Sequence, residues 1–359
     1  MEPVRDSSKE MQLLSELVLS PAAEKPVGAT SGLTVADIER LEELGASNHV
    51  IMRAFPRLQE MVRAEGNVES AEAVRRAVER EQLRIQHALG FLEQICSTLR
   101  KNGCPAVVIK SLDHWPDLGS DLDLYSDAEA NELVRVMRES FRAQLAERSW
   151  GDRLANKWNF IVPGLPELVE IHVGRLGQTG EQIAVTKSVM GRAAQRQVGG
   201  YQFLAAAPED RIVISTLQRM YRHFYIRLCD IVDNARLLDE RLVDFDYLRS
   251  LGLNSGLWEG IATYLVIISE YVERYRGYGV PLPAWVMKSA RFGSEQVFFR
   301  RDFLRVPIMP HSMNLYAKEL KSFLQRGDLR NGFRLSLLPC LATAAALEMK
   351  ITGSDKGIW

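Results

Sequence analysis

Two acidic residues stand one residue apart in "SDLDLYS" (120–126), a segment whose apolar pattern is otherwise typical of a β-strand. Because alternate side chains leave a strand on the same face, we expect Asp121 and Asp123 to lie side by side. Like charges that close repel one another unless a cation lies between them. Glu170 in "ELVEIHVG" (167–174) alternates with apolar residues in the same way. If the two strands pair, three carboxylates converge on one site, which suits Mg²⁺.

These segments resemble the motifs of the DNA polymerase β-like nucleotidyltransferases. In that superfamily an apolar residue, a Gly and a Gly or Ser are followed, after a short gap, by Asp-apolar-Asp/Glu-apolar, and a third acid lies on a later strand. Here "VIKS" (108–111), a gap of nine residues, "DLDL" (121–124) and "VEIH" (169–172) have that order. The similarity covers roughly residues 80–240. It is closest to a loosely characterised bacterial branch with an apolar-Lys-Gly first motif and an acid-apolar-His third strand.

The resemblance implies an enzyme that moves a nucleoside monophosphate from an NTP, most simply ATP, to an acceptor and releases pyrophosphate. Asp121, Asp123 and Glu170 would be the catalytic residues and the Mg²⁺ ligands, and Glu170 would also help to deprotonate the acceptor. Two metal ions in such a site stabilise the attacking and leaving oxygens of an in-line displacement. The residues expected to hold the phosphates of the NTP are Lys110, Ser111, Gly119, Ser120 and Arg227.

The chain departs from the superfamily at Lys110-Ser111, where a glycine is usual. A glycine at this point lets backbone N–H groups approach the triphosphate. The Ser111 hydroxyl and the Lys110 ammonium could donate to the phosphates instead. The same departure is typical of an inactive member, so a nucleotide-binding or scaffold protein without turnover is the alternative from a different class.

The sequence after Pro208 predicts a long helix with one polar stripe. His223, Arg227, Asp230 and Asn234 recur at i, i+4, i+7 and i+11, which is helical spacing. The stripe could face the site, with Arg227 touching the nucleotide phosphates, or it could hold the helix to the α/β core through ion pairs. For Asp230 the structural interpretation is favoured.

Four further residues have both a functional and a structural interpretation. His172 follows Glu170 by two residues and shares its face, so it could assist the acceptor or simply pack. His114 is expected at the surface, and Trp115 beside it could stack a base. Lys157 could bind the triphosphate, although the simpler expectation is that it lies in a solvated loop.

The elements that must position these residues form a small α/β unit between helical regions. Helical spacing covers 34–64 and 69–100, and the chain from 208 onward is predicted to be helical. Strand patterns occupy 106–110, 121–126, 158–164 and 167–174, and a Gly-Gly hairpin occupies 196–204. The sequence therefore predicts an α+β fold with a small mixed sheet. Its expected parts are a flexible N-terminal segment (1–32), an N-terminal helical region (33–100), the nucleotidyltransferase core (101–205) and a C-terminal helical domain (206–359).

Composition narrows the choice of partners. The net charge of −1 and the pI of about 6.6 provide no basic field for nucleic acid, so a small-molecule acceptor is favoured. A toxin-like enzyme that modifies tRNA or a protein stays open. The four cysteines lack CxxC spacing, the N-terminal residues lack a signal-peptide pattern, and the longest apolar run is too short for a membrane span. We therefore expect a cytoplasmic protein without a membrane partner; the acceptor and the oligomeric state are not determined by the sequence.

Overall fold

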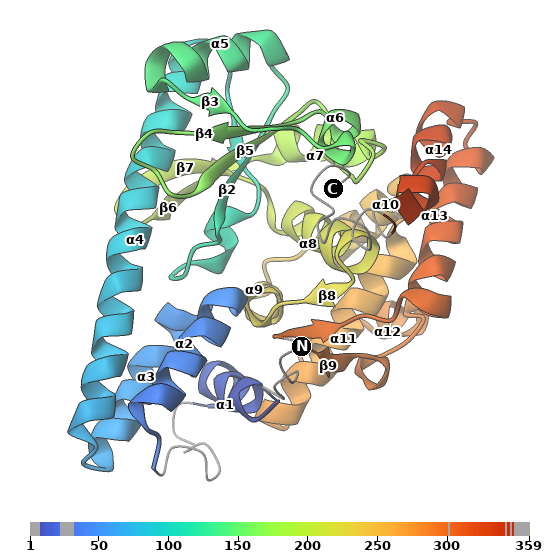
Figure 1. The fold of residues 1–359 in the computed structure, drawn as a ribbon. Helices are drawn as coiled ribbons and strands as arrows, with labels where there is room; N and C mark the ends of the chain where they lie inside the picture. The colour runs from blue at the N-terminus through green and yellow to red at the C-terminus, as the bar shows by residue number, and fades with distance from the viewer. Residues whose placement is uncertain (1–7, 22–31, 301, 342, 345–346, 348–359) are drawn as a thin grey trace.

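Four helices form the N-terminal part of the computed structural model, which describes residues 8–21, 32–300, 302–341, 343–344 and 347 (Figure 1). The side chain of Thr34 accepts a hydrogen bond from the backbone N–H of Asp37, and the Asp37 carboxylate accepts one in return, so a capping box starts the second helix. These helices agree with the predicted stretches 34–64 and 69–100. They are α1 (Ser8–Leu19), α2 (Val35–Asn48), α3 (Ile51–Ala64) and α4 (Val68–Lys101).

Helix α1 lies within the segment 1–32 that the sequence suggested to be flexible. Its apolar residues Leu14 and Leu17 are buried, and the helix packs on α3 and α11. The hydroxyl of Ser15 lies 2.8 Å from that of Tyr271. This part of the segment is therefore an ordered helix, whereas residues 1–7 and 22–31 lie outside the described residues.

A seven-stranded mixed sheet follows, in the order β3-β4-β5-β2-β1-β7-β6. The predicted strand 121–126 is confirmed, and the hairpin turn at Gly199 and Gly200 is confirmed by their positive φ angles of 56° and 86°. Strand β3 and the helices α6 and α7 were not predicted. The strands are β1 (Val107–Val108), β2 (Asp121–Ser126), β3 (Gln144–Leu145), β4 (Lys157–Ile161), β5 (Leu168–Val173), β6 (Ala194–Val198) and β7 (Tyr201–Ala205).

The sheet contains both parallel and antiparallel pairs and lies among helices, so the α+β class is confirmed. Helices cover both of its faces. On one face, α4 and α5 pack against the apolar side chains of β2, β4 and β5. On the other face, α7 and α8 pack beside Val107 and Tyr125. The helices of this part are α5 (Ala130–Phe141), α6 (Trp150–Ala155), α7 (Ile183–Arg192) and α8 (Pro208–Thr216), and a short 3₁₀ turn, η1, spans Ser111–His114.

The long helix predicted from Pro208 is wrong, because the chain leaves the helical conformation between η2 and α9. After α8 a π-helical turn, η2 (Leu217–Arg222), leads to Phe224 with a φ of 53°, and then to strand β8 (Tyr225–Ile226). Arg227 is extended and caps α9 (Leu228–Asp239). His223 and Arg227 therefore do not share a helix with Asp230 and Asn234, and the predicted single stripe does not exist.

Strand β8 also belongs to a small sheet that the prediction of an almost wholly helical C-terminal region did not include. It pairs with β10, which pairs with β9, in a second sheet of three strands. Ile226 opposes Leu304 in this sheet and both are buried, so burial of two apolar side chains favours pairing over further helix. The remaining elements are α10 (Phe245–Ser255), α11 (Trp258–Arg276), α12 (Ala284–Ser289), η3 (Ser294–Gln296), β9 (Phe298–Arg300), β10 (Phe303–Arg305), η4 (Ile308–Ser312), α13 (Met313–Gln325) and α14 (Leu329–Ser336).

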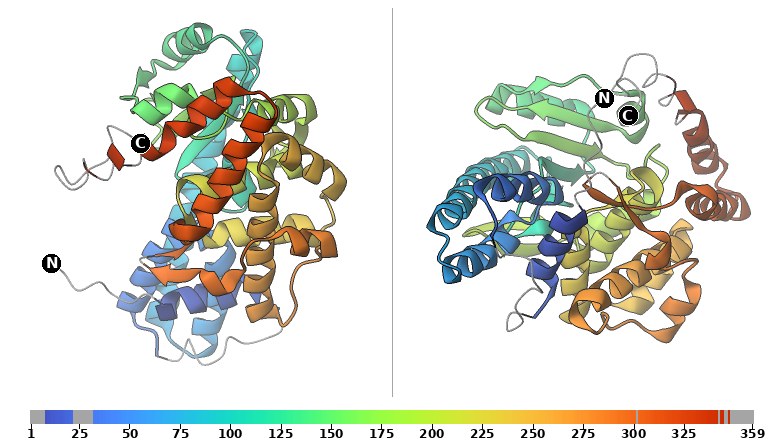
Figure 2. Two further views of the ribbon diagram at one scale, coloured as in Figure 1. Left: turned by 90° about the vertical axis from the view of Figure 1, so that its right-hand side faces the viewer. Right: turned by 60° about the horizontal axis from the view of Figure 1, so that its bottom comes forward.

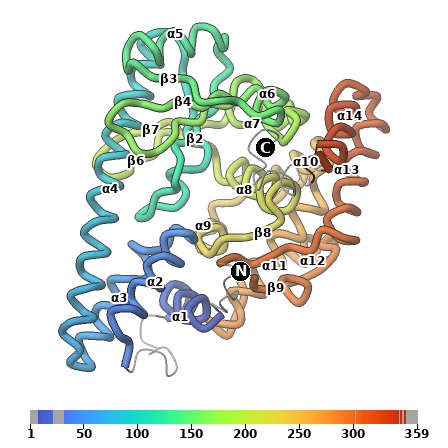
Figure 3. The backbone as a smooth tube through the Cα atoms, viewed as in Figure 1, coloured from blue at the N-terminus to red at the C-terminus, as the bar shows by residue number. Residues whose placement is uncertain are grey.

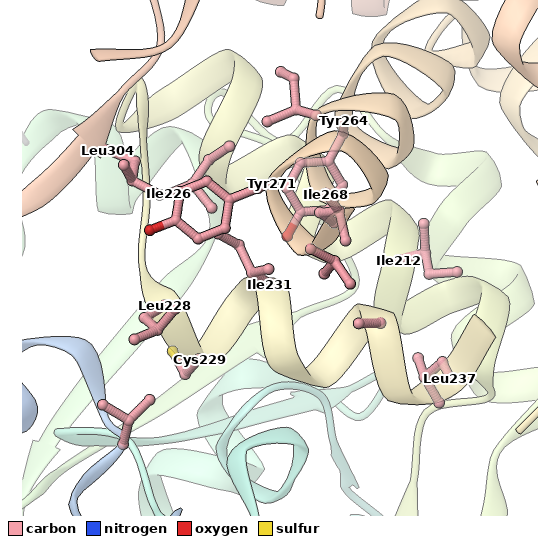
Figure 4. Packing of buried hydrophobic residues seen from close by; sticks show 14 of the residues in the cluster. Ile212, Ile226, Leu228, Cys229, Ile231, Leu237, Tyr264, Ile268, Tyr271 and Leu304 are labelled. Carbon is pink, nitrogen blue, oxygen red and sulfur yellow. The ribbon is translucent and has the colours of Figure 1, made fainter. Parts of the chain in front are cut away.

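Helix α11 is the centre of the C-terminal region. Tyr264, Ile268 and Tyr271 project from it toward Ile231 of α9, as Figure 4 shows. Helices α13 and α14 lie on the side of the molecule opposite α4 (Figures 1 and 2). Within the described ranges, no helix is both long and apolar enough to cross a membrane.

Helix α4 joins the two apolar cores of the molecule. Its first half, including Val74 and Ala77, belongs to the core of the helical regions, and its second half, including Leu92 and Leu99, belongs to the core of the sheet. Figure 3 shows α4 running along one side, from α2 and α3 to α5.

Leu92→Ala should lower the free energy of unfolding by about 2–5 kcal/mol, because its fully buried side chain would leave a cavity. The matched control on the same helix is Leu83→Ala, whose side chain is 67% exposed; its effect should stay within about 0.5 kcal/mol. Urea unfolding followed by circular dichroism measures both. Equal losses in the two variants would contradict this description of the core.

Candidate active site

The two central strands bring the predicted acids together. Leu122 and Leu124 of β2 are buried toward α4 and α5, which turns Asp121 and Asp123 to the opposite face. Strand β5 runs parallel to β2 and places Glu170 directly beside Asp123. The alternation that predicted two adjacent carboxylates on one face of β2 is thus present, and β5 is the neighbouring strand.

The group with the closest ligand atoms differs from the predicted one. Asp123, Glu170 and His172 each offer an atom within 4.8 Å of the others. Asp121 lies beside Leu168 in the register and lines the same pocket, but it is not a member of this group. The structure therefore places His172 beside the acids, on the face that the sequence predicted, with Asp121 further out.

Two lysines compensate the buried carboxylates. Lys110 forms an ion pair with Asp123. Lys157, on β4, lies 3.0 Å from an oxygen of Glu170 and 3.0 Å from one of Asp152. The expectation of a solvated loop at Lys157 is wrong, because the residue is buried in the sheet beside β5. The negative charges are therefore held together by ammonium groups in this structure.

Burial and these cations shift the pKa values of Asp123, Glu170 and His172 in different directions. Burial raises the pKa of Asp123 to about 7, against the opposing effect of Lys110. Burial also acts to raise the pKa of Glu170, but the charges of Lys110 and Lys157 outweigh it and hold that pKa below its usual range. Burial lowers the pKa of His172 well below its usual value, and Lys110 adds to this. At neutral pH the site therefore contains an ionised Glu170, a neutral His172 and an Asp123 close to its midpoint.

The residues predicted to hold phosphates line the same pocket as the carboxylates, although Lys110, Ser111 and Arg227 already have partners within the protein. Lys110, Ser111, Gly119 and Ser120 all line the pocket, and Ser120 is exposed. The hydroxyl of Ser111 donates to the carbonyl of Asp121 at 3.0 Å and accepts from the Asp123 N–H at 2.7 Å. Its proton is used to hold the edge of β2 and is not offered to the pocket.

Basic residues from η2 to α9 form the opposite wall of this pocket, which encloses about 180 Å³. Arg219 pairs with Asp230 at 2.7 Å, and Arg227 contacts the ring of His49 at 2.7 Å. Arg222 is half-buried and makes no hydrogen bond or ion pair with any residue that the structure describes. The structural interpretation of Asp230 fits these contacts. Of the three arginines in this wall, Arg222, which the stripe pattern did not include, is the one whose side chain has no partner among the described residues.

A buried polar network lies beneath the pocket. The ring of His114 lies 2.5 Å from Asp233, and Arg53 of α3 lies 2.5 Å from the other oxygen of Asp233. Arg53 also approaches Asp117 at 3.8 Å. Burial would raise the pKa of Asp233, but Arg53 and His114 hold it below its usual value. The predicted surface position of His114 is wrong, because its buried ring joins η1 to Asp233 of α9 inside the protein.

Comparisons of the chain with protein-family models, curated proteins and solved structures found no match. Asp121, Asp123 and Glu170 offer the oxygen ligands that Mg²⁺ prefers. Arg222 and its neighbours offer donors that suit phosphate or carboxylate oxygens.

Asp233→Asn should lower the free energy of unfolding by about 3–5 kcal/mol, since it leaves Arg53 buried without its main counter-charge. The matched control is Asp239→Asn on the same helix, where the carboxylate pairs with Arg276 at the surface. There the loss should be about 0–1 kcal/mol. Chemical denaturation at pH 7 measures both variants, and a loss as small at Asp233 as at Asp239 would show that the network is not a stabilising element.

The raised pKa of Asp123 predicts a specific pH dependence. Its carboxyl ionises near pH 3.8 in the unfolded chain and near 7 in the folded one, so ionisation costs the wild type stability as the pH rises through this window. Asp123→Asn has no such proton. The stability of the variant relative to wild type should therefore be higher at pH 8 than at pH 5, by about 2–3 kcal/mol.

Urea unfolding at the two pH values measures this difference. Millimolar Mg²⁺ at pH 8 should stabilise the wild type more than the variant, because an ion that binds the folded state shifts the equilibrium. A stability difference that does not change with pH would refute the raised pKa.

Proposed function

We propose that this protein is a Mg²⁺-dependent nucleotidyltransferase, which moves a nucleoside monophosphate from an NTP to an acceptor and releases pyrophosphate. One observation carries the proposal: carboxylates from two adjacent strands face a wall of arginines across a single pocket. The acids suit a divalent ion, and the arginines suit a polyphosphate.

Asp121, Asp123 and Glu170 would hold the metal. When bound, Mg²⁺ would neutralise phosphate oxygens and stabilise the charge that develops on the leaving pyrophosphate. Lys110 and Lys157 already lie against these carboxylates. In the metal-free protein they balance the charge, and in the loaded protein Lys110 would be free to turn toward a phosphate.

The remaining residues have more specific roles in this proposal. Arg222 would bind the triphosphate or a group beside it, because it has no partner among the described residues. Gly119 and Ser120 would approach the phosphates from the loop before β2. Arg227 would contribute only after leaving His49. Ser111 would be a positioning residue, since its hydroxyl fixes the backbone that carries both aspartates.

A scaffold that binds nucleotide without turnover is the second candidate. It is favoured by the ion pairs of Lys110 and Lys157, which occupy the carboxylates that a metal would need. ATP is the first NTP to test, and a small molecule is the preferred acceptor because the overall charge is close to zero.

Asp123→Asn should reduce Mg²⁺-dependent pyrophosphate release by at least about a hundredfold, since a metal ligand that acts where charge develops is lost. Binding of MgATP should weaken much less, because the main contribution falls in the transition state. The matched control is Asp127→Asn, which changes an exposed carboxylate just after the same strand and should leave turnover unchanged.

A coupled pyrophosphate assay with each NTP, alongside calorimetric NTP binding, separates the candidates. Wild type that binds MgNTP and releases no pyrophosphate with any acceptor would favour the scaffold. Wild type that binds no NTP would contradict both candidates.

A further inference from the structure

A second pocket of about 40 Å³ opens beside the first. The two pockets share Lys110, Gln218 and Arg222. Where the first is lined mainly by charged groups, the second has an aliphatic wall. This wall consists of Ile109, Leu176, Ile214 and Leu217.

A buried imidazole without partners also faces the second pocket. His172 is 6% exposed, and neither of its ring nitrogens has a hydrogen-bond partner among the described residues. Buried polar groups are normally paired, and leaving one unpaired costs free energy. A ligand hydroxyl in the cavity could form a hydrogen bond with one of these unpaired ring nitrogens.

Two unpaired side chains stand at the boundary between the pockets. The Gln218 amide and the Arg222 guanidinium lie four residues apart on η2, and neither makes a side-chain hydrogen bond with a described residue. A guanidinium binds a carboxylate through two parallel hydrogen bonds. The boundary therefore suits the carboxylate of a ligand whose carbon chain enters the aliphatic wall.

The side chains that line the two pockets indicate which pocket suits the nucleobase and which suits the acceptor. Tyr225 and His223, which could stack a base, line the first pocket, whereas the described residues that line the second include no aromatic side chain besides the imidazole of His172. The base is therefore better accommodated in the first pocket.

We infer that the second pocket is the acceptor subsite, and that the acceptor is a small hydroxy acid with a short aliphatic chain. This inference rests on the proposed nucleotidyl transfer. The carboxylate would lie on Arg222 and Gln218, the chain would contact Ile214 and its aliphatic neighbours, and the hydroxyl would lie near His172 and Glu170.

In the transfer step the acceptor oxygen bonds to the α-phosphorus of the NTP. The bond from that phosphorus to the pyrophosphate oxygen breaks, and its electron pair leaves with pyrophosphate. The hydroxyl proton passes through the Glu170 carboxylate to solvent. The products are a hydroxy-acid ester of the nucleoside monophosphate and pyrophosphate.

The test uses 2-hydroxy-4-methylpentanoate as the probe and measures its binding to the full chain by calorimetry and ligand-observed NMR. Wild type should bind it, and Arg222→Gln should weaken binding by about tenfold or more, because a charge-assisted pair is lost. Ile214→Phe should abolish binding by filling the pocket. The control Leu253→Phe, at a side chain that is 54% exposed on α10, should bind like wild type.

The outcomes separate this inference from the function on which it rests. Absence of probe binding to wild type, or equal binding by wild type and Arg222→Gln, overturns the subsite even if Ile214→Phe does not fold. Pocket-dependent binding without pyrophosphate release from any NTP keeps the subsite and overturns the transferase. Pyrophosphate release with other acceptors, but no binding of the probe, keeps the transferase and overturns the subsite. 4-Methylpentanoate, which lacks the hydroxyl, should bind but not react.

Discussion

The parallel pairing of β2 with β5 is the constraint on which the site depends. Its register fixes Asp123 beside Glu170, and burial makes two adjacent carboxylates costly unless positive charge accompanies them. The chain supplies that charge from both sides: Lys110 follows β1, and Lys157 lies in β4. Four neighbouring strands are thus tied to one local charge balance, so changes in strand order and changes in the site cannot be independent.

The arrangement of the arginine wall depends on the break in the helix after α8. Had the helix continued from Thr216, it would have carried its polar residues past the acids at regular intervals. The π-helical turn instead carries Arg219 and Arg222, and the extended segment before α9 carries Arg227. Arg219 pairs with Asp230 and Arg227 hydrogen-bonds to His49, which leaves Arg222 as the one of the three whose side chain has no partner within the described part of the chain.

Much of the sheet could be predicted because its residues carry a local signal. The alternation in 121–126 and 168–173 defines which side chains share a face, and the strands lie where that pattern placed them. The break in the helix at residues 217–227 could not be predicted from a local pattern, because its residues suit a helix. The strand that forms there pairs Ile226 with Leu304, which lies far along the chain. The same limit applies to His114 and Asp233, which are 119 positions apart and lie on elements whose contact depends on the assembled fold.

Helix α4 has a consequence for how the molecule can be divided. It contains 34 residues, which corresponds to a length of about 50 Å, and it contributes apolar side chains to both cores. A cut at residue 101 would therefore remove Leu89, Leu92, Ile95 and Leu99 from beneath the sheet and expose its apolar face to water. The sheet and the helical regions share helix α4, so unfolding of either end of this helix disturbs its hydrogen-bonded backbone as a whole. The two cores should therefore unfold together.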